Sequence, residues 1–338
     1  GVTSTMLQVL SEQQELINLR VMGKHHLPDA SINISFWQVV KMCRKPLTDG
    51  RYRIFHCRRV DEMIQALLLK HVFGAKIKII FSSAAQRRRS GSTKWLTDRM
   101  DAVLAMCKAS ASYLHRKPDA IIYHGVKTNV YTPPEDKNQA WRELNLLPKS
   151  AKQGQYGIAI LGRVRKQKGV HLFVQSCIEI LDKHPDYTAV VVGAISSSNE
   201  DFVKELQAKI AQAGLSERIV FAGEQNFADI PTIFSALSLV VALSDNEGFG
   251  LTILEAMSSG ASVLASEAGA WPEVVEDGKN GFVVPVNDLP AVIEKMDLLL
   301  SDPQNLAQMG SQGRERVLAN YSVQREAEQL VEFYRSIM

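Results

Sequence analysis

The chain has 338 residues, of which 46% are hydrophobic, and its 39 Lys and Arg exceed its 36 Asp and Glu by a net charge of +3. This length favours two domains with separate cores, since a domain usually spans about 100–200 residues. No stretch approaches the roughly 20 apolar residues of a membrane-spanning helix, so a soluble or peripheral protein is expected. Four cysteines without metal-ligand spacing, and no secretory signal at the start, favour the cytoplasm.

The charge is divided unevenly along the chain. Residues 1–145 hold 23 Lys and Arg against 12 Asp and Glu, a balance of +11, whereas residues 146–338 hold 16 against 24, a balance of −8. A basic front half suits an anionic partner such as lipid headgroups, an acidic glycan or nucleic acid, although basic side chains can also serve solubility alone.

Short apolar runs alternate with longer amphipathic ones along the front half, a pattern that predicts βα units around a parallel sheet. It predicts strands at 52–57, 77–82, 102–107 and 120–123, and helices near 2–15, 61–73 and 108–115. The first residues enter a helical pattern at once. We therefore expect that an initial strand is missing and that Gly1 belongs to a strand-to-helix loop.

A turn-rich, charged stretch at 132–154, with one short helix near 139–144, is typical of an interdomain connection. Behind it we expect strands at 157–161, 189–193, 219–222, 239–243, 262–265 and 282–284. Helices are expected near 168–183, 200–213, 229–236, 250–259, 289–300, 303–318 and 322–337. These elements predict an α/β protein with domains at 1–145 and 146–321 and a C-terminal helix, within 322–338, that crosses back to the first domain.

Two carboxylates mark the segment that says most about function, with Glu247 in a turn and Glu255 about one turn inside the helix that follows. Between them, Gly248-Phe249-Gly250 lets backbone amides approach a ligand, and the positive end of the helix at Leu251 points into the same space. That geometry favours an elongated anionic ligand, such as a sugar joined to a nucleoside through a diphosphate. An ordinary loop turn, with a Glu that serves only the helix dipole, is the alternative.

A second anion-binding loop is predicted at residues 162–169, between a buried strand and a helix. Open parallel sheets bind ligands at this edge. Arg163 can grip two phosphate oxygens with its planar fork, and Lys168 adds a compact second charge. A solvated basic loop is the alternative, but two anion-binding loops in one domain argue against coincidence.

Other phosphate and metal motifs do not occur in this sequence. Gly248-Phe249-Gly250 lacks the third glycine of a dinucleotide fingerprint, because Ile253 takes that place. The sequence also lacks a phosphate loop ending in Gly-Lys-Ser/Thr and a paired-histidine zinc helix. Asp245-Asn246-Glu247 resembles a metal-binding triplet, but Glu247 has the competing task of meeting the sugar, so no metal and no cofactor are expected.

The sharpest feature of the front half is the basic loop Gln86-Arg87-Arg88-Arg89-Ser90-Gly91-Ser92-Thr93-Lys94-Trp95. Because it follows a strand, we expect it to open into the interdomain cleft and to meet an acidic acceptor. Nucleic acid is the rival partner, but the run lacks interleaved aromatics apart from Trp95, and no nucleic-acid fold signature accompanies it. A solvated turn is the remaining interpretation.

The second half contains three motifs, which are Gly162-Arg163 with Lys168-Gly169, Glu247-Gly248-Phe249-Gly250 with Glu255, and Gly269-Ala270-Trp271-Pro272-Glu273 followed by Asp277-Gly278-Lys279-Asn280-Gly281-Phe282. Together they resemble the motifs of retaining glycosyltransferases of family 4. Their order and spacing match the family from about residue 120 to residue 320. Tyr123-His124-Gly125-Val126 and the opening Gly1-Val2-Thr3-Ser4-Thr5 are most similar to bacterial lipopolysaccharide core mannosyltransferases.

The resemblance implies the GT-B fold, in which two Rossmann-like domains face each other, and it implies roles for individual residues. Arg163 and Lys168 would hold the diphosphate and, with Glu247 near the sugar ring, form the catalytic set, while Glu255 would bind the ribose. The other expected donor-binding residues are Gly1, Gly162, Gly223, Glu224, Gly248, Phe249, Gly250, Leu251 and Thr252. On the acceptor side we expect Arg87, Arg88, Arg89, Lys94 and His124.

Three departures from the family pattern accompany the resemblance. His124-Gly125-Val126-Lys127 stands where members often carry Asn-Gly-Val-Asp, residues 82–86 replace a histidine common after a front-domain strand, and Ala270 replaces a frequent glycine. We expect a retaining transfer of a hexose, mannose as first guess, from GDP-mannose or a UDP-hexose to an anionic lipid-linked core glycan. The enzyme is expected to work in the cytoplasm, with a peripheral position on the inner face of the cytoplasmic membrane as a further expectation. A nucleotide-sugar epimerase and a binding-only module are the alternatives.

Overall fold

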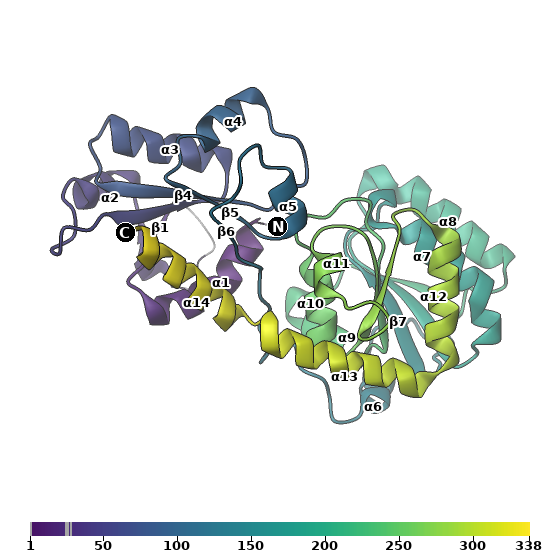
Figure 1. Ribbon diagram of the computed structural model, residues 1–338. Helices are drawn as coiled ribbons and strands as arrows, with labels where there is room; N and C mark the ends of the chain where they lie inside the picture. Colours follow the sequence, from purple (N-terminus) through teal and green to yellow (C-terminus); the bar gives the residue numbers. More distant parts are fainter. Residues whose placement is uncertain (1, 24–26, 28) are drawn as a thin grey trace. The chain divides into compact units, whose positions relative to one another are not determined.

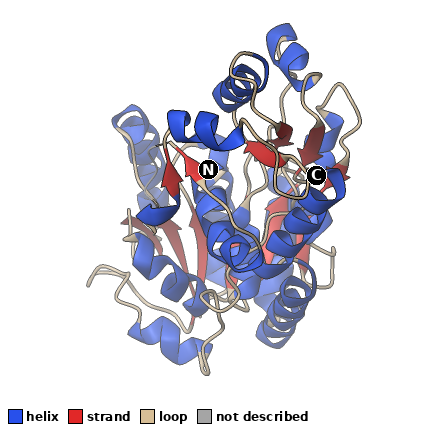
Figure 2. Cartoon of the chain, turned by 90° about the vertical axis from the view of Figure 1, so that its left-hand side faces the viewer, coloured by secondary structure: helices blue, strands red, loops and turns tan. Residues whose placement is uncertain are grey.

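The computed structural model describes residues 2–23, 27 and 29–338, with side chains from residue 5 onward. Its internal contacts divide the chain into two compact units. The first unit is Gly1–Gly125 with Ser322–Met338, and the second is Val126–Tyr321 (Figure 1). Each unit has parallel strands flanked by helices (Figure 2), which confirms the predicted α/β class.

The first unit is built on a four-stranded parallel sheet of order β3-β4-β5-β6. The strands are β3 (Arg53–Cys57), β4 (Ile77–Ser83), β5 (Ala102–Ala105) and β6 (Ala120–Ile121). The helices are α1 (Val2–Leu16), α2 (Phe36–Cys43), α3 (Val60–His71), α4 (Gly91–Thr97), α5 (Lys108–Ser112) and α14 (Val323–Ile337), with the 3-10 turn η1 (Ala30–Ile32). A separate parallel pair, β1 (Val21–Met22) with β2 (Asn33–Ile34), was not predicted, and neither were α2 and α4.

The second unit is built on a six-stranded parallel sheet of order β12-β11-β10-β7-β8-β9. The strands are β7 (Tyr156–Leu161), β8 (Tyr187–Val192), β9 (Ile219–Gly223), β10 (Leu239–Ala242), β11 (Ser262–Ser266) and β12 (Gly281–Val284). The order reverses between β7 and β10, which are hydrogen-bonded neighbours. Ligands of open α/β sheets bind beyond the carboxyl ends of the strands at such a reversal.

Helices and short turns connect these six strands. The helices are α6 (Lys137–Glu143), α7 (Val170–Ile180), α8 (Glu200–Gln212), α9 (Ile230–Ala236), α10 (Leu251–Ser258), α11 (Trp271–Val274), α12 (Leu289–Ser301) and α13 (Pro303–Asn320). The 3-10 turns are η2 (Lys166–Lys168), η3 (Leu181–Lys183), η4 (Ser197–Asn199) and η5 (Phe227–Asp229). The inner strands β8, β10 and β11 are buried along their whole length and are near-continuous apolar runs, which is why the sequence pattern located them.

The boundary between the units falls after Gly125, whereas the sequence predicted it after residue 145. Residues 126–145 belong to the second unit because their side chains are anchored there. Trp141 is fully buried and its Nε1 donates to the carbonyl oxygen of Gly154 at 3.0 Å. Lys137 donates from Nζ to the backbone of the second unit, including the carbonyl of Ser259 at 3.2 Å.

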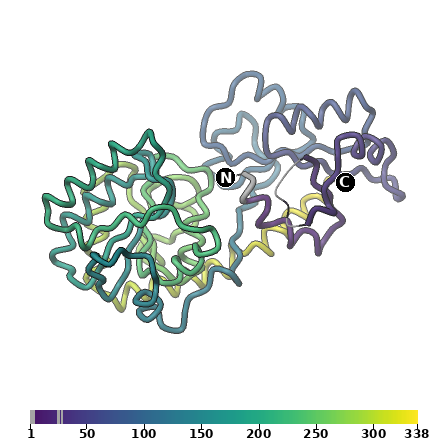
Figure 3. Tube along the Cα trace, turned by 180° about the vertical axis from the view of Figure 1, so that it is seen from behind, coloured from purple at the N-terminus to yellow at the C-terminus, as the bar shows by residue number. Residues whose placement is uncertain are grey.

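The C-terminal helix α14 belongs to the first unit, where it packs against α1 (Figure 3, yellow beside purple). Its apolar stripe of Ala327, Leu330, Val331 and Tyr334 is buried. Tyr334 also shares its hydroxyl with Nδ1 of His56 at 2.6 Å, and the other ring nitrogen of that histidine lies 2.5 Å from Oγ of Ser82. None of the helices described is both long and apolar enough to cross a bilayer.

Candidate active site

The loops that follow β7 and β10 are held against each other at the carboxyl edge of the second sheet. Asp245 donates its amide to the carbonyl oxygen of Gln167 at 2.9 Å. Gly169, with a φ of 72°, lies so close to Leu243 that a Cβ on this glycine would be 2.3 Å from the Leu243 carbonyl oxygen. The two predicted anion-binding loops therefore form one rigid corner.

Lys168 and Glu247 meet in this corner, although they are far apart in sequence. Nζ of Lys168 lies 2.5 Å from Oε2 of Glu247, and both side chains are mostly buried. Ser244 donates from Oγ to the same carboxylate oxygen at 3.4 Å. Lys168 is thus a paired cation. The sequence predicted Lys168 and Glu247 in two separate loops, but it did not predict their ion pair.

Arg163, five positions before Lys168 in the same loop, is a cation without an ion-pair partner among the described residues. Its side chain is exposed and makes no ion pair or hydrogen bond to any residue that the structure describes. The preceding residue, Gly162, has a φ of 133° and its amide donates to the carbonyl of Val192 at 2.9 Å. The backbone that carries Arg163 is therefore fixed while its guanidinium is available to a ligand.

Glycines end three neighbouring strands and bring their backbones close together. Gly193 donates its amide to the carbonyl of Gly223 at 2.8 Å, and a Cβ on Gly193 would lie 1.8 Å from the Gly162 carbonyl oxygen. No side chain can occupy this position between the ends of β7, β8 and β9. Glu224, which follows β9, is exposed.

Helix α10 begins at the same edge with no side chain capping its N-terminus. Its N-cap residue, Gly250, has a φ of 84°, and Nε1 of the buried Trp271 donates to the Gly250 carbonyl oxygen at 2.9 Å. The first amides of a helix have no partner within the helix and carry its positive partial charge. Those of Leu251 and Thr252 therefore add to the positive potential near Lys168.

Glu255 lies in the second turn of α10 and is held by a tyrosine that the sequence analysis did not single out. The hydroxyl of Tyr131 donates to Oε1 of Glu255 at 3.2 Å. Burial raises the pKa of Glu255 to about 7, and this hydrogen bond acts in the opposite direction. Arg314 fixes the tyrosine, because its Nη1 donates to the carbonyl oxygens of Tyr131 at 2.6 Å and Ser258 at 2.5 Å.

Replacing Tyr131 by Phe should raise the pKa of Glu255 further, since the hydrogen bond that stabilises its carboxylate is lost. If the carboxylate binds the donor, donor affinity rises with pH as Glu255 ionises near pH 7 in the unaltered protein, and the Tyr131→Phe variant needs a higher pH for the same affinity. Titration calorimetry with UDP and GDP from pH 5.5 to 8.5 measures the shift. The control is Tyr156→Phe, because the hydroxyl of Tyr156 has no hydrogen-bond partner among the described residues. Identical profiles for all three proteins would contradict this role.

In the basic loop of the first unit, one arginine is held by contacts within the unit and the other two are exposed. Arg89 is half-buried, donates from Nη2 to Oγ of Ser83 at 2.5 Å and lies 4.9 Å from the centre of the Phe81 ring. Burial lowers the pKa of Arg89, and Arg87 adds to the effect. Arg87 and Arg88 are exposed, as is Lys94 on α4. The acceptor contacts of Arg87, Arg88 and Lys94 stay predictions, whereas the guanidinium of Arg89 is held by Ser83 in its own unit.

His124 is occupied by a contact within the first unit. It is 6% exposed, and its Nδ1 lies 2.8 Å from Oε1 of Glu326 on α14, whose other carboxylate oxygen accepts from the amide of Gly125 at 2.8 Å. The structure therefore gives His124 a role in holding α14, and we no longer assign it to the acceptor. Gly1 lies outside the described residues.

No group of three or more His, Cys, Asp or Glu side chains within 2–23, 27 and 29–338 is arranged to hold a metal ion.

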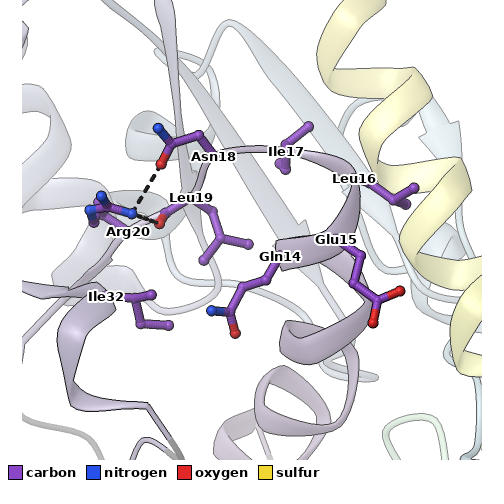
Figure 4. Close-up of a pocket in the computed structure, with 8 residues that line it drawn as sticks. All are labelled: Gln14, Glu15, Leu16, Ile17, Asn18, Leu19, Arg20 and Ile32. Atoms are coloured by element: carbon purple, nitrogen blue, oxygen red, sulfur yellow. Dashed lines mark hydrogen bonds between the residues drawn. The ribbon is translucent and has the colours of Figure 1, made fainter.

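A surface pocket of the first unit lies at the end of α1 (Figure 4), where Arg20 donates to the carbonyl of Leu19 at 2.8 Å and to Oδ1 of Asn18 at 3.0 Å. None of the predicted site residues lines that pocket.

Comparison with known proteins agrees with this geometry. The sequence profile of the family "Glycosyl transferases group 1" matches residues 144–316. The chain is 38% identical over its whole length to the lipopolysaccharide core biosynthesis mannosyltransferase LpsB of Rhizobium meliloti, covering 94% of that protein. It is also 38% identical to the mannosyltransferase LpcC of Rhizobium leguminosarum, again over its whole length and 93% of that protein.

Solved structures give the same assignment. The C-terminal domain of a group 1 glycosyl transferase, LpcC of Francisella tularensis, is 41% identical, with a TM-score of 0.55 over 59% of this chain and 99% of that one. Anabaena HepE, solved with UDP and glucose, shares the fold at 23% identity and a TM-score of 0.72, over 89% of this chain and 81% of that one. These likenesses bear out the expected GT-B class. The chain belongs to the glycosyl transferases group 1 family.

Proposed function

We propose that this glycosyltransferase moves mannose from a nucleoside-diphosphate donor to a lipopolysaccharide core acceptor, with retention of the anomeric configuration. The observation that carries the donor side is the corner formed by Arg163, the Lys168–Glu247 pair and the uncapped start of α10. Full-length similarity to LpsB and LpcC, which are named as core mannosyltransferases, supports the sugar and the acceptor. Cytoplasmic action at a membrane surface belongs to the same proposal.

The chemical task of this corner is to stabilise the leaving diphosphate. Negative charge grows on its oxygens as the glycosidic bond stretches, and fixed positive groups aimed at that charge lower the barrier. Arg163 offers a forked guanidinium, Lys168 a compact ammonium and α10 its first amides. Together they would place positive charge around the diphosphate oxygens.

The remaining donor contacts follow from the same placement. Glu255 would accept hydrogen bonds from the ribose hydroxyls, and the backbone at Gly223 and Glu224 would lie beside the nucleobase. Glu247 would face the sugar ring, where it can stabilise positive charge or orient hydroxyl groups. Because Glu247 already holds Lys168, its position is set before any ligand arrives.

The test of the whole proposal is transfer itself. The enzyme is incubated with GDP-mannose, UDP-glucose and UDP-galactose, each with isolated core lipid acceptor, and the products are read by mass spectrometry. We expect a hexose to be added to the lipid from GDP-mannose. Conversion of the sugar without an acceptor would indicate an epimerase, and nucleotide-sugar binding without any product would indicate a binding-only protein.

The acceptor side has its own prediction. Replacing Arg87 and Arg88 by Ser should weaken use of an anionic acceptor by about tenfold or more, because charge-assisted hydrogen bonds to its carboxylate or phosphate groups are lost. Hydrolysis of the donor in water should stay unchanged. The matched control removes two exposed cations of the second unit, Arg142 and Lys149, by the same change to Ser. Equal loss of transfer and hydrolysis would count against an acceptor loop.

A further inference from the structure

Helix α3 carries an exposed apolar stripe on the side that faces away from its own core. Val60, Ile64, Leu68 and the following Val72 repeat every four residues, and they are 38%, 49%, 43% and 69% exposed. Residues four apart lie on one face of a helix. The opposite face of α3 is fully buried through Met63, Ala66 and Leu69. The outer face of a helix that covers a sheet is normally polar, so this α3 stripe needs a partner.

An aromatic cluster connects the α3 stripe to α2. Trp37 of α2 is 67% exposed, and its ring packs edge-to-face on Phe73, which directly follows Val72, with 5.5 Å between ring centres. Phe36 packs on the same ring at 5.5 Å. The indole is therefore fixed while most of its surface remains in water. Tryptophan is enriched where apolar and aqueous phases meet, such as the surface of a bilayer.

Three cations follow Trp37 along the chain, one on α2 and two directly after it. Lys41 lies one helical turn from Trp37 on the same face, and Arg44 and Lys45 come directly after Cys43, the last residue of α2. All three are exposed, and none makes an ion pair with a residue that the structure describes. On α3 the exposed acidic side chain is Asp61, since the carboxylate of Glu62 accepts from the amides of Arg58 and Arg59.

We infer that the α3 stripe, Trp37 and the three cations Lys41, Arg44 and Lys45 form a surface that docks on an anionic lipid bilayer. The apolar side chains would enter the boundary between headgroups and acyl chains, while the cations would lie at the lipid phosphates. This combination of an apolar face with adjacent Lys and Arg is how peripheral proteins bind anionic membranes. The inference rests on the proposed function in one respect: a lipid-linked acceptor lies in a membrane, and this is why a bilayer is taken as the partner of the surface.

Co-sedimentation of the full chain with lipid vesicles tests this surface without any nucleotide sugar. We expect binding to vesicles of phosphatidylglycerol and phosphatidylethanolamine, weaker binding to phosphatidylcholine, and loss of the difference in high salt. The double variant Ile64→Gln, Leu68→Gln should bind roughly tenfold less well or worse. Lys41→Gln with Lys45→Gln should weaken only the binding to the anionic vesicles. Glutamine suits exposed helix positions, and Lys45 is exposed beyond the end of α2, so both variants should fold.

The matched control makes two substitutions to Gln at apolar side chains of similar exposure in the second unit. Leu298 of α12 and Leu318 of α13 are 51% and 49% exposed, and Leu298→Gln with Leu318→Gln should bind vesicles like the unaltered chain. Absence of binding to anionic vesicles, or equal binding by the α3 variant, would overturn the proposal. If instead the α3 variant turned a dimer into a monomer in sedimentation velocity and kept its vesicle binding, the stripe would be a self-association surface. Because no donor is present, failure here is separate from failure of sugar transfer.

Discussion

Replacing Arg163 by Ala should lower kcat/KM for the nucleotide-sugar donor by about 10²–10³-fold, and Lys168→Ala should do the same, because each removes a fixed positive group from the leaving diphosphate. Arg163 is exposed and has no partner among the described side chains, so its loss should leave the free energy of unfolding within about 0.5 kcal/mol. Steady-state kinetics and denaturant unfolding measure the two effects. Unchanged turnover in both variants would contradict the phosphate assignment.

Lys168 needs a sharper experiment, because its ion pair with Glu247 offers a second explanation for any loss of activity. If Lys168 acts only by holding Glu247, then Lys168→Ala should cost little in a protein that already carries Glu247→Gln. If Lys168 binds the diphosphate itself, its loss should cost a similar factor in both backgrounds. The control for a general change of charge in this loop is Lys166→Ala, since Lys166 is an exposed neighbour.

The sequence predicted the corner of the second unit because its local signals agree with its tertiary structure. The strands there are buried on both faces and stand out as apolar runs, and the loops after β7 and β10 must reach one edge because the two strands are parallel neighbours. The contact between Lys168 and Glu247 could not be predicted from spacing, because 79 positions separate them. The donor-site roles of these residues remain predictions.

What the sequence did not reveal depends on contacts between distant segments. Tyr131 meets Glu255 across 124 positions, and no local pattern distinguishes it from a core tyrosine. The charged stretch before residue 145 suggested a linker, yet its buried Trp141 anchors it to the second unit. Arg87, Arg88 and Arg89 are consecutive arginines that the sequence alone does not distinguish, yet only the Arg89 side chain donates a hydrogen bond to Ser83 among the described contacts. The strands β1 and β2 have two residues each, too short for any period to be recognised.

Gly169 allows the loop before α7 to lie against β10, and replacing it by Ala should be among the most damaging single changes in the second unit. Its φ of 72° already disfavours a side chain, and the new Cβ would lie 2.3 Å from the carbonyl oxygen and 2.4 Å from the Cβ of Leu243. Backbone strain and overpacking together should cost about 3 kcal/mol or more of unfolding free energy. Because Lys168 is the adjacent residue, donor turnover should also fall under conditions where the variant remains folded.

The matched control for this substitution is Gly214→Ala. Gly214 has a φ of 73° in the turn after α8, but a Cβ there would have no atom within 4 Å. It should therefore lose only the roughly 1 kcal/mol of an unfavourable backbone conformation and keep full activity. Denaturant unfolding of both variants separates the cost of the backbone conformation from the cost of overpacking, since the φ angles are nearly equal and only Gly169 is crowded by Leu243. Equal costs would mean that the loop can move away from β10, and the rigid corner that presents Lys168 would then be wrong.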